Sequence, residues 1–143
     1  MLFFITSSNH KFYLSGSDKL IFLRKENKFM WLTGKPPVKD YYAVIFSSTK
    51  EDNLEEAYYE MDNALMELAQ KQPGFLGYEN AEKDNKSVFI SYWENMEAIN
   101  NWRKNSLHLS AKAQANKWYK RILSQICKVE HTMLFEKDNL VKN

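Results

Sequence analysis

The sequence predicts an α+β fold in which helices cover one face of an antiparallel sheet, and three observations support this class. The stretch 41–47, YYAVIFS, is apolar at nearly every position, as in a strand that is covered on both sides. Two runs rich in Phe, Tyr, Val and Ile, at 75–81 and 87–93, flank the polar connector 82–86 and predict a hairpin. Apolar residues also recur at helical spacing before and after the hairpin, giving the order β-α-β-β-α-β over residues 41–136.

Composition and charge are those of one soluble globular domain. The chain has 143 residues, of which 44% are hydrophobic and 27% are charged, enough for one buried core. Its net charge is +2 and its lysines are scattered between acids, so we expect neither nucleic acid nor membrane as a partner. Cys127 is the only cysteine, which excludes an intramolecular disulfide and indicates a reducing compartment. The apolar start at 2–5 is too short for a signal-peptide core, and we expect a cytoplasmic protein.

Residues 1–38 have the composition of strands and turns. Their apolar-aromatic runs lie at 2–5, 11–14, 19–23 and 28–32. Turns are expected at 15–18 and 26–27, and the adjacent Pro36 and Pro37 mark a boundary because proline cannot continue a central ladder. We expect a β extension and not an independent domain. It would either protect one edge of the sheet or fold back over the open sheet face.

A helix is predicted over 54–71, between the first strand and the hairpin. Its apolar stripe comprises Leu54, Tyr58, Met61, Leu65 and Leu68. Asp52 or Asn53 is expected to cap its first turn. Such a stripe could bind in the groove of a partner, but packing on the chain's own sheet is the favoured interpretation.

After the hairpin the pattern becomes helical again and then returns to strand. Apolar residues at three-residue spacing begin a short helix; these are Met96, Ile99 and Trp102. This helix is predicted over 96–104, with a break near Asn105, and a second helix is predicted over 107–122. The small and apolar side chains on one face of the second helix are Ala111, Ala115, Trp118 and Ile122. The last strand is predicted over 125–135, and the polar tail 136–143 is expected to fray. The apolar face of that strand comprises Cys127, Val129, His131, Met133 and Phe135.

The predicted domain at 39–143 therefore has the split βαβ, ferredoxin-like arrangement. Its helices cover one sheet face and leave the other bare. The bare face carries one of two sets: Tyr41, Ala43 and Ile45, or Tyr42, Val44 and Phe46. Because an apolar face of that size is usually covered by a partner, we expect a homodimer formed through the open sheet face.

Several segments, in order, resemble the antibiotic biosynthesis monooxygenase family. They are PGFLGYE at 73–79, FISYWENMEAINNWR at 89–103, His108-Leu109 and Trp118-Tyr119. The resemblance covers about 41–136. It implies a ferredoxin-like fold that dimerises into an α/β barrel. In catalytic members it also implies oxygenation of an electron-rich aromatic without metal or flavin.

Aromatic side chains are concentrated in the second half of the chain, where a cavity can form between sheet and helices. Trp102, Trp93 and Tyr78 are the candidates to line a pocket for a small aromatic ligand. The competing interpretation is that the tryptophans belong to the core. On the resemblance, His108 is the candidate base, whereas Arg103 and Tyr119 are candidates to stabilise an oxyanion.

The haem-degrading branch of the family makes a sharper comparison. Members of this branch carry an asparagine on the first strand, a tryptophan on the helix and a later histidine that ligates haem. Trp102 matches the tryptophan, but the apolar run 44–46 stands in place of the asparagine and Lys112 in place of the histidine. His108 lies one helical turn earlier. We therefore expect neither haem nor another cofactor.

Two functional hypotheses remain from the sequence. The first is a cofactor-independent monooxygenase acting on a small aromatic or quinol-like molecule. The second is a non-catalytic protein that binds a small ligand or a partner on the same scaffold. The sequence has no glycine-rich phosphate loop, nucleophile elbow or metal-ligand spacing that would indicate another enzyme class.

Overall fold

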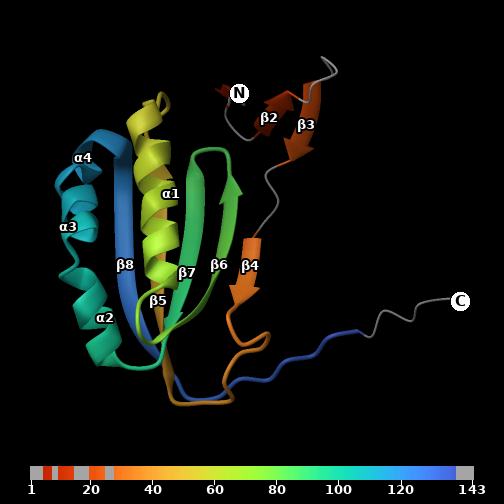
Figure 1. The fold of residues 1–143 in the computed structure, drawn as a ribbon, viewed down its shortest axis with the longest axis vertical. Coiled ribbons are helices and arrows are strands. Elements are labelled where there is room, and N and C mark those ends of the chain that lie inside the picture. The colour runs from red at the N-terminus through yellow and green to blue at the C-terminus, as the bar shows by residue number, and fades with distance from the viewer. Residues whose placement is uncertain (1–4, 8–9, 15–19, 25–27, 138–143) are drawn as a thin grey trace, which may run out of the picture.

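The computed structural model describes residues 5–7, 10–14, 20–24 and 28–137, with side chains from residue 30 onward (Figure 1). Its first three strands, β1 (Ile5–Ser7), β2 (His10–Leu14) and β3 (Leu20–Arg24), pair antiparallel in a sheet of their own. Most of the predicted run at 2–5, and the turns expected at 15–18 and 26–27, lie outside the described residues.

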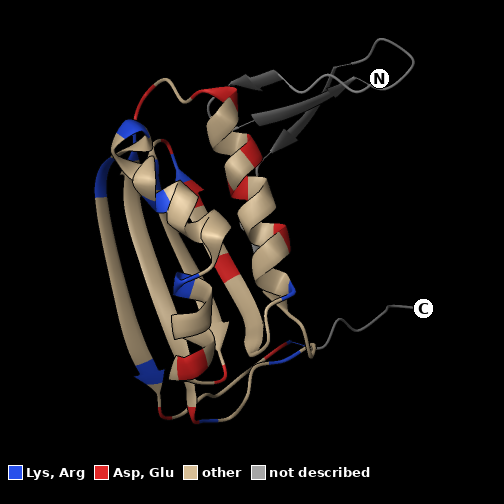
Figure 2. Ribbon diagram, turned by 60° about the vertical axis from the view of Figure 1, so that its left-hand side comes forward, with Lys and Arg blue, Asp and Glu red and all other residues tan. Residues whose placement is uncertain are grey.

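The other strands form a larger sheet in the order β4-β6-β7-β5-β8, in which every neighbouring pair is antiparallel. They are β4 (Lys28–Trp31), β5 (Tyr41–Lys50), β6 (Phe75–Lys83), β7 (Lys86–Trp93) and β8 (Tyr119–Val129). One sheet face is covered by α1 (Glu56–Gln70), α2 (Met96–Arg103), α3 (Ser106–Ala113) and α4 (Ala115–Trp118), as Figures 1 and 2 show. The ferredoxin-like order is confirmed, and β4 adds a fifth strand at the β6 edge.

The register between strands shows which face of β5 lies beneath the helices and which lies on the open side of the sheet. Tyr42 lies opposite Trp93, and both Tyr42 and Val44 pack against the core beneath the helices. The set Tyr41, Ala43 and Ile45 therefore lies on the open face, because successive strand residues point to opposite sides. This settles the two alternatives that the sequence left open.

The open face holds an aromatic trio next to β4. The Trp31 ring stacks on Tyr92 with centroids 4.4 Å apart, and Tyr41 packs edge-on against both rings. Gly77 lies opposite Trp31 in the ladder, and a Cβ there would collide with the Met30 carbonyl oxygen, so glycine lets β4 approach β6. The extension thus both protects the β6 edge and places one side chain on the open face.

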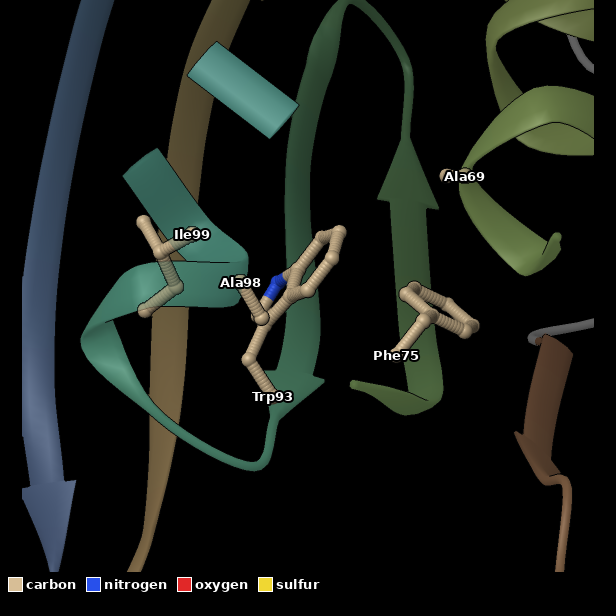
Figure 3. Packing of buried hydrophobic residues seen from close by; sticks show 5 residues of the cluster. All are labelled: Ala69, Phe75, Trp93, Ala98 and Ile99. Atoms are coloured by element: carbon tan, nitrogen blue, oxygen red, sulfur yellow. The ribbon is translucent and has the colours of Figure 1, made fainter. Parts of the chain in front are cut away.

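The core lies where α2 and the end of α1 meet the sheet. Trp93 and Ile99 are 0% and 1% exposed, and Ala98 of α2, Phe75 of β6 and Ala69 of α1 complete the cluster (Figure 3). Gly74 adopts φ +81°, and a Cβ there would stand 2.6 Å from the Ala98 Cβ. The turn before β6 therefore needs glycine both for its backbone angle and for its contact with α2.

The prediction for the last helix and the last strand was wrong in its boundaries. Residues 119–122 are strand, not helix, because β5 extends to Lys50 and its backbone pairs with β8 as far as Tyr119. Residues 130–135 are not strand, since β5 begins at Tyr41 and provides no partner beyond Val129. Instead the Thr132 N–H donates to the Val38 carbonyl, 2.7 Å away. The predicted apolar face that included His131, Met133 and Phe135 therefore does not form, and these three side chains are exposed.

The first helix also differs at its start. Its N-cap position is Glu55, which makes no side-chain capping bond, and the predicted cap Asp52 instead accepts hydrogen bonds from Asn85 and Lys120. The stripe packs on the chain's own sheet as predicted, with Tyr58 buried. In the hairpin, both strands extend into the predicted connector and leave a turn at 84–85.

Residues of both charge signs are interspersed along the coloured part of the ribbon in Figure 2. In the described part of the chain, no helix is both long and apolar enough to cross a membrane.

Candidate functional site

The break between α2 and α3 forms because each helix has its own asparagine cap. The Asn95 side chain accepts from the Ala98 N–H at 2.8 Å, and the Asn105 side chain accepts from the Leu107 N–H at 3.0 Å. Each amide oxygen satisfies a backbone donor that the first helical turn leaves unpaired. The predicted break near Asn105 is confirmed, and it places His108 in the first turn of α3.

The break also brings His108 against Trp102. Their rings stack with centroids 4.9 Å apart and an interplanar angle of 12°. The His108 Nδ1 lies 3.1 Å from the Trp102 carbonyl oxygen. A carbonyl oxygen can only accept a hydrogen bond, so Nδ1 carries the proton in the neutral ring and Nε2 is left as the basic nitrogen.

The protonation state of His108 follows from its surroundings. Burial lowers its pKa below the ordinary 6.5; the Trp102 carbonyl opposes this, whereas the positive charges of Lys112 and Arg103 add to it. His108 is therefore neutral at pH 7. A neutral, half-buried imidazole with a fixed tautomer is suited to accept a proton at Nε2.

The two candidate tryptophans are not equivalent. Trp93 is fully buried, packs edge-on against Phe75 and donates its indole N–H to Ser91 Oγ at 2.9 Å. Trp102 is only partly buried and stacks on Trp93 with centroids 6.2 Å apart. Trp93 is thus a core residue, and Trp102 joins the core to His108.

The helices leave part of the apolar sheet face beneath them exposed. We call this surface the floor; it comprises Tyr78, Phe89, Ile122 and Ile126. Tyr78 stacks on Phe89 with centroids 5.7 Å apart, and both rings are partly exposed. Ile122 and Ile126 point to the same face from the edge strand β8, and they are 41% and 40% exposed. The floor has an apolar surface that an aromatic ligand could contact.

The structure does not bring all the predicted residues together. Arg103 is exposed and acts on His108 through its charge. Tyr119 packs against Phe46 and Tyr58, with ring centroids 5.8 and 6.0 Å away, at the other end of β5. The described contacts of Tyr119 thus belong to a different cluster from those of His108.

That second cluster surrounds a buried lysine that sequence reasoning missed. Lys50 Nζ lies 2.9 Å from Glu82 Oε2, with side-chain exposures of 9% and 13%. The ammonium also lies 5.3 Å from the centroid of the Tyr58 ring. Ser48 and Ser87 share a hydrogen bond of 2.9 Å one step along the sheet. No sequence signal pairs Lys50 with Glu82, because their contact depends on strand register.

A β-bulge builds this cluster. Arg121 lies opposite Thr49, but the next pair is Lys50 with Tyr119, so Lys120 is the extra residue. The bulge turns the Tyr119 side chain toward the helices, and Lys120 turns outward to contact Asp52 Oδ2 at 2.7 Å. Across the described residues, there is no group of three or more His, Cys, Asp or Glu side chains that could hold a metal ion.

Comparisons with known proteins agree with this fold. Residues 40–114 match the family model described as "Antibiotic biosynthesis monooxygenase". The chain is also 40% identical over 112 residues to the uncharacterized protein YqjZ of Bacillus subtilis (strain 168), covering 77% of this chain and 95% of that one.

Two solved structures are similar at low sequence identity. SnoaB from Streptomyces nogalater, described as a cofactor-independent oxygenase, has a TM-score of 0.56 at 15% identity, covering 66% of this chain and 97% of SnoaB. Rv0793 from Mycobacterium tuberculosis has a TM-score of 0.55 at 17% identity, covering 68% of this chain and 99% of Rv0793. At such identities the likeness shows a shared fold.

Proposed function

Since the chain belongs to the antibiotic biosynthesis monooxygenase family, we propose that it oxygenates a small aromatic or quinol-like molecule held against Trp102 and His108. The observation that supports this most directly is the hydrogen bond from His108 Nδ1 to the Trp102 carbonyl. It leaves Nε2 basic and fixes the ring beside a partly exposed aromatic surface.

The chemistry requires a base and a water-poor site. His108 Nε2 takes the proton of a substrate hydroxyl, and the resulting anion is electron-rich enough to react with molecular oxygen. A ring carbon forms a bond to oxygen while its C–H bond and the O–O bond break. The second oxygen atom leaves as water with that hydrogen and the proton returned from Nε2, so the substrate supplies all four electrons and becomes a quinone. The stack of Trp102 on Trp93 would exclude water from one side of the reacting ring.

We propose that this reaction uses no metal or organic cofactor. SnoaB, which shares the fold, is described as a cofactor-independent oxygenase. In the proposed reaction the substrate takes the place of an electron-donating cofactor.

A second candidate is a non-catalytic ligand-binding protein. It is favoured by the exposure of Arg103 and by the contacts of Tyr119 at the other end of β5. In that case the partly exposed floor would bind the same small aromatics without oxidising them.

We also propose that two copies associate through the open sheet face. That face carries the partly exposed Ile45 and Ile90, and its Val88 and Leu123 are 42% and 40% exposed. Scattering or ultracentrifugation at micromolar concentration should give about twice the chain mass of 17.0 kDa. A monomer would contradict the dimer.

Oxygen uptake separates the two candidate functions. The protein should consume oxygen with at least one member of a panel of dihydroxynaphthalenes, and His108→Gln should lower the rate by about 100-fold, as expected for loss of a general base. His131→Gln is the matched control, because His131 is exposed on the segment after β8. Tight binding without uptake by the wild type would support the ligand-binding protein instead.

A further inference from the structure

The buried Lys50 cluster lies on the sheet face that the helices cover, and Trp102 and His108 belong to two of those helices. Register relates the two ends: Tyr78 pairs with Ser91, and four residues along β6 Glu82 pairs with Ser87. Tyr78 packs against the core cluster that includes Trp102, whereas Glu82 binds Lys50. At about 3.3 Å per residue, roughly 13 Å of sheet separates these rows.

The surface between the two ends is largely aromatic. The intervening row consists of Phe46, Phe89 and Asn80, in register across β5, β7 and β6. All three are partly exposed although they face the helix layer. A flat ligand lying on this row would have Trp102 at one end and the Lys50 cluster at the other.

Lys50 can donate to such a ligand. An ammonium has three N–H donors and no acceptor. One N–H of Lys50 points to the Glu82 carboxylate, and the Tyr58 ring attracts the charge from the side. These described contacts leave donor capacity for a ligand atom that accepts hydrogen bonds.

Tyr119 can supply a second donor. The Tyr119 ring packs edge-on against Tyr58, with centroids 6.0 Å apart, and its phenolic hydroxyl can donate a hydrogen bond. Burial raises the pKa of both phenols, and Tyr119 therefore keeps a hydroxyl proton of its own. The bulge at Lys120 has already turned this hydroxyl toward the helix-covered side.

The charges in the Lys50 cluster favour one kind of hydrogen-bond acceptor on the ligand. Glu82 already neutralises Lys50, and Asp62 adds a negative charge near both tyrosines. A second carboxylate would meet this negative field, whereas a neutral carbonyl oxygen would not. The arrangement thus fits a ketone or quinone oxygen better than an anionic group.

We propose that Lys50 and Tyr119 bind a carbonyl oxygen of an elongated aromatic ligand whose other end lies against Trp102 and His108. This inference rests on the proposed function for the location of the ligand, but it concerns recognition and not turnover. It assigns a specificity-determining role to a cluster remote from the base. Lys50 and Tyr119 act by holding one end of the ligand while its other end meets Nε2.

A matched pair of probes tests the proposal by calorimetry. One probe is a hydroxybiphenyl with an acetyl group on its far ring, and the other has an ethyl group in its place. The wild type should bind the acetyl compound about tenfold more tightly, as expected for one hydrogen bond from a charged donor. Equal affinities, or no binding of either probe, would overturn the proposal.

Substitutions test which residues are responsible for the preference for the acetyl compound. Lys50→Met combined with Glu82→Met removes both charges and should abolish the tenfold preference, and Tyr119→Phe should reduce it a few-fold. Lys128→Met is the control on the same face of the sheet, because Lys128 is exposed and contacts only the exposed Asp40 among its described ion pairs. If the double variant does not fold, the acetyl preference of Tyr119→Phe alone tests the assignment. A preference that survives in Tyr119→Phe and in the folded double variant overturns the assignment.

The outcome is independent of catalysis. His108→Gln should keep the acetyl preference even though oxygen uptake falls. An acetyl preference without uptake by the wild type would refute the monooxygenase and retain the carbonyl site. Oxygen uptake by the wild type without an acetyl preference would support the monooxygenase and refute the carbonyl site.

Discussion

The two ends of the helix-covered sheet face use similar residues in different ways. At one end, Trp93 is sealed by Phe75 and α2 and makes a single hydrogen bond to Ser91. At the other, the rings of Tyr58 and Tyr119 surround a buried ion pair. Aromatic side chains therefore form the core at one end and surround a polar cluster at the other, and only their neighbours distinguish the two cases.

The contributions of the two ends to the free energy of unfolding should also differ. A sealed aromatic core contributes through burial and packing, and any truncation leaves a cavity. A buried ion pair contributes little net stability, but removing one partner leaves an unpaired charge. This contrast makes single and double variants the most informative experiments.

The largest effect is expected at the sealed end. Trp93→Ala should lower the free energy of unfolding by about 3–5 kcal/mol, because a fully buried indole and its contacts with Phe75 are lost. Urea denaturation measures the loss. A change below about 1 kcal/mol would show that the core can collapse around the missing ring.

At the polar end, the single and double variants should differ sharply. Lys50→Met should cost about 3 kcal/mol because Glu82 is left charged and nearly buried. Adding Glu82→Met should recover most of this loss, since apolar side chains replace both charges. Additive losses in the double variant would contradict a coupled pair.

Trp102→Ala should have an intermediate effect. Its ring is only partly buried, so we expect a loss of about 2 kcal/mol, below that of Trp93→Ala. It should also weaken the binding of the hydroxybiphenyl probes, which Trp93 does not contact in the proposed arrangement. A loss as large as that of Trp93→Ala, with probe binding unchanged, would make Trp102 a core residue without a ligand role.

The smallest effect is the pH dependence of stability due to His108. Burial lowers the pKa of this ring below 6.5, so the folded state binds the proton more weakly than the unfolded state. The stabilisation is present above pH 6.5 and is lost as the pH falls through the lower folded-state pKa. Denaturation at about pH 7 and about pH 5 should show a smaller loss in His108→Gln than in the wild type. The exposed His131→Gln should keep the wild-type loss.

Much of the fold was predictable because its signals are local. The hairpin between β6 and β7, the short helix α2 and the break at Asn105 each follow from spacing, turn residues or a capping side chain. The family resemblance, carried by segments such as PGFLGYE at 73–79, is confirmed by the match over 40–114. The cytoplasmic location stays a prediction, and so do the roles of the site residues.

The candidate site was predictable only in part. The sequence placed Trp102 at a ligand pocket and, through the family resemblance, His108 as its base, and the two rings do stack. It grouped Tyr119 with them, whereas Tyr119 belongs to the Lys50 cluster. Tyr92, an aromatic residue of the same part of the chain, lies on the open face with Trp31 and Tyr41.

By itself, the sequence determined the order of the elements and the apolar character of each, because hydrophobic period and capping act over a few residues. Tertiary structure decided where β8 begins, since Trp118 and Ile122 keep a helical spacing but residues 119–122 pair with the backbone of β5. It also decided which face of β5 meets the helices and which tyrosine meets Lys50. Those outcomes depend on the register between strands far apart in the chain, and a shift of one residue would reverse them.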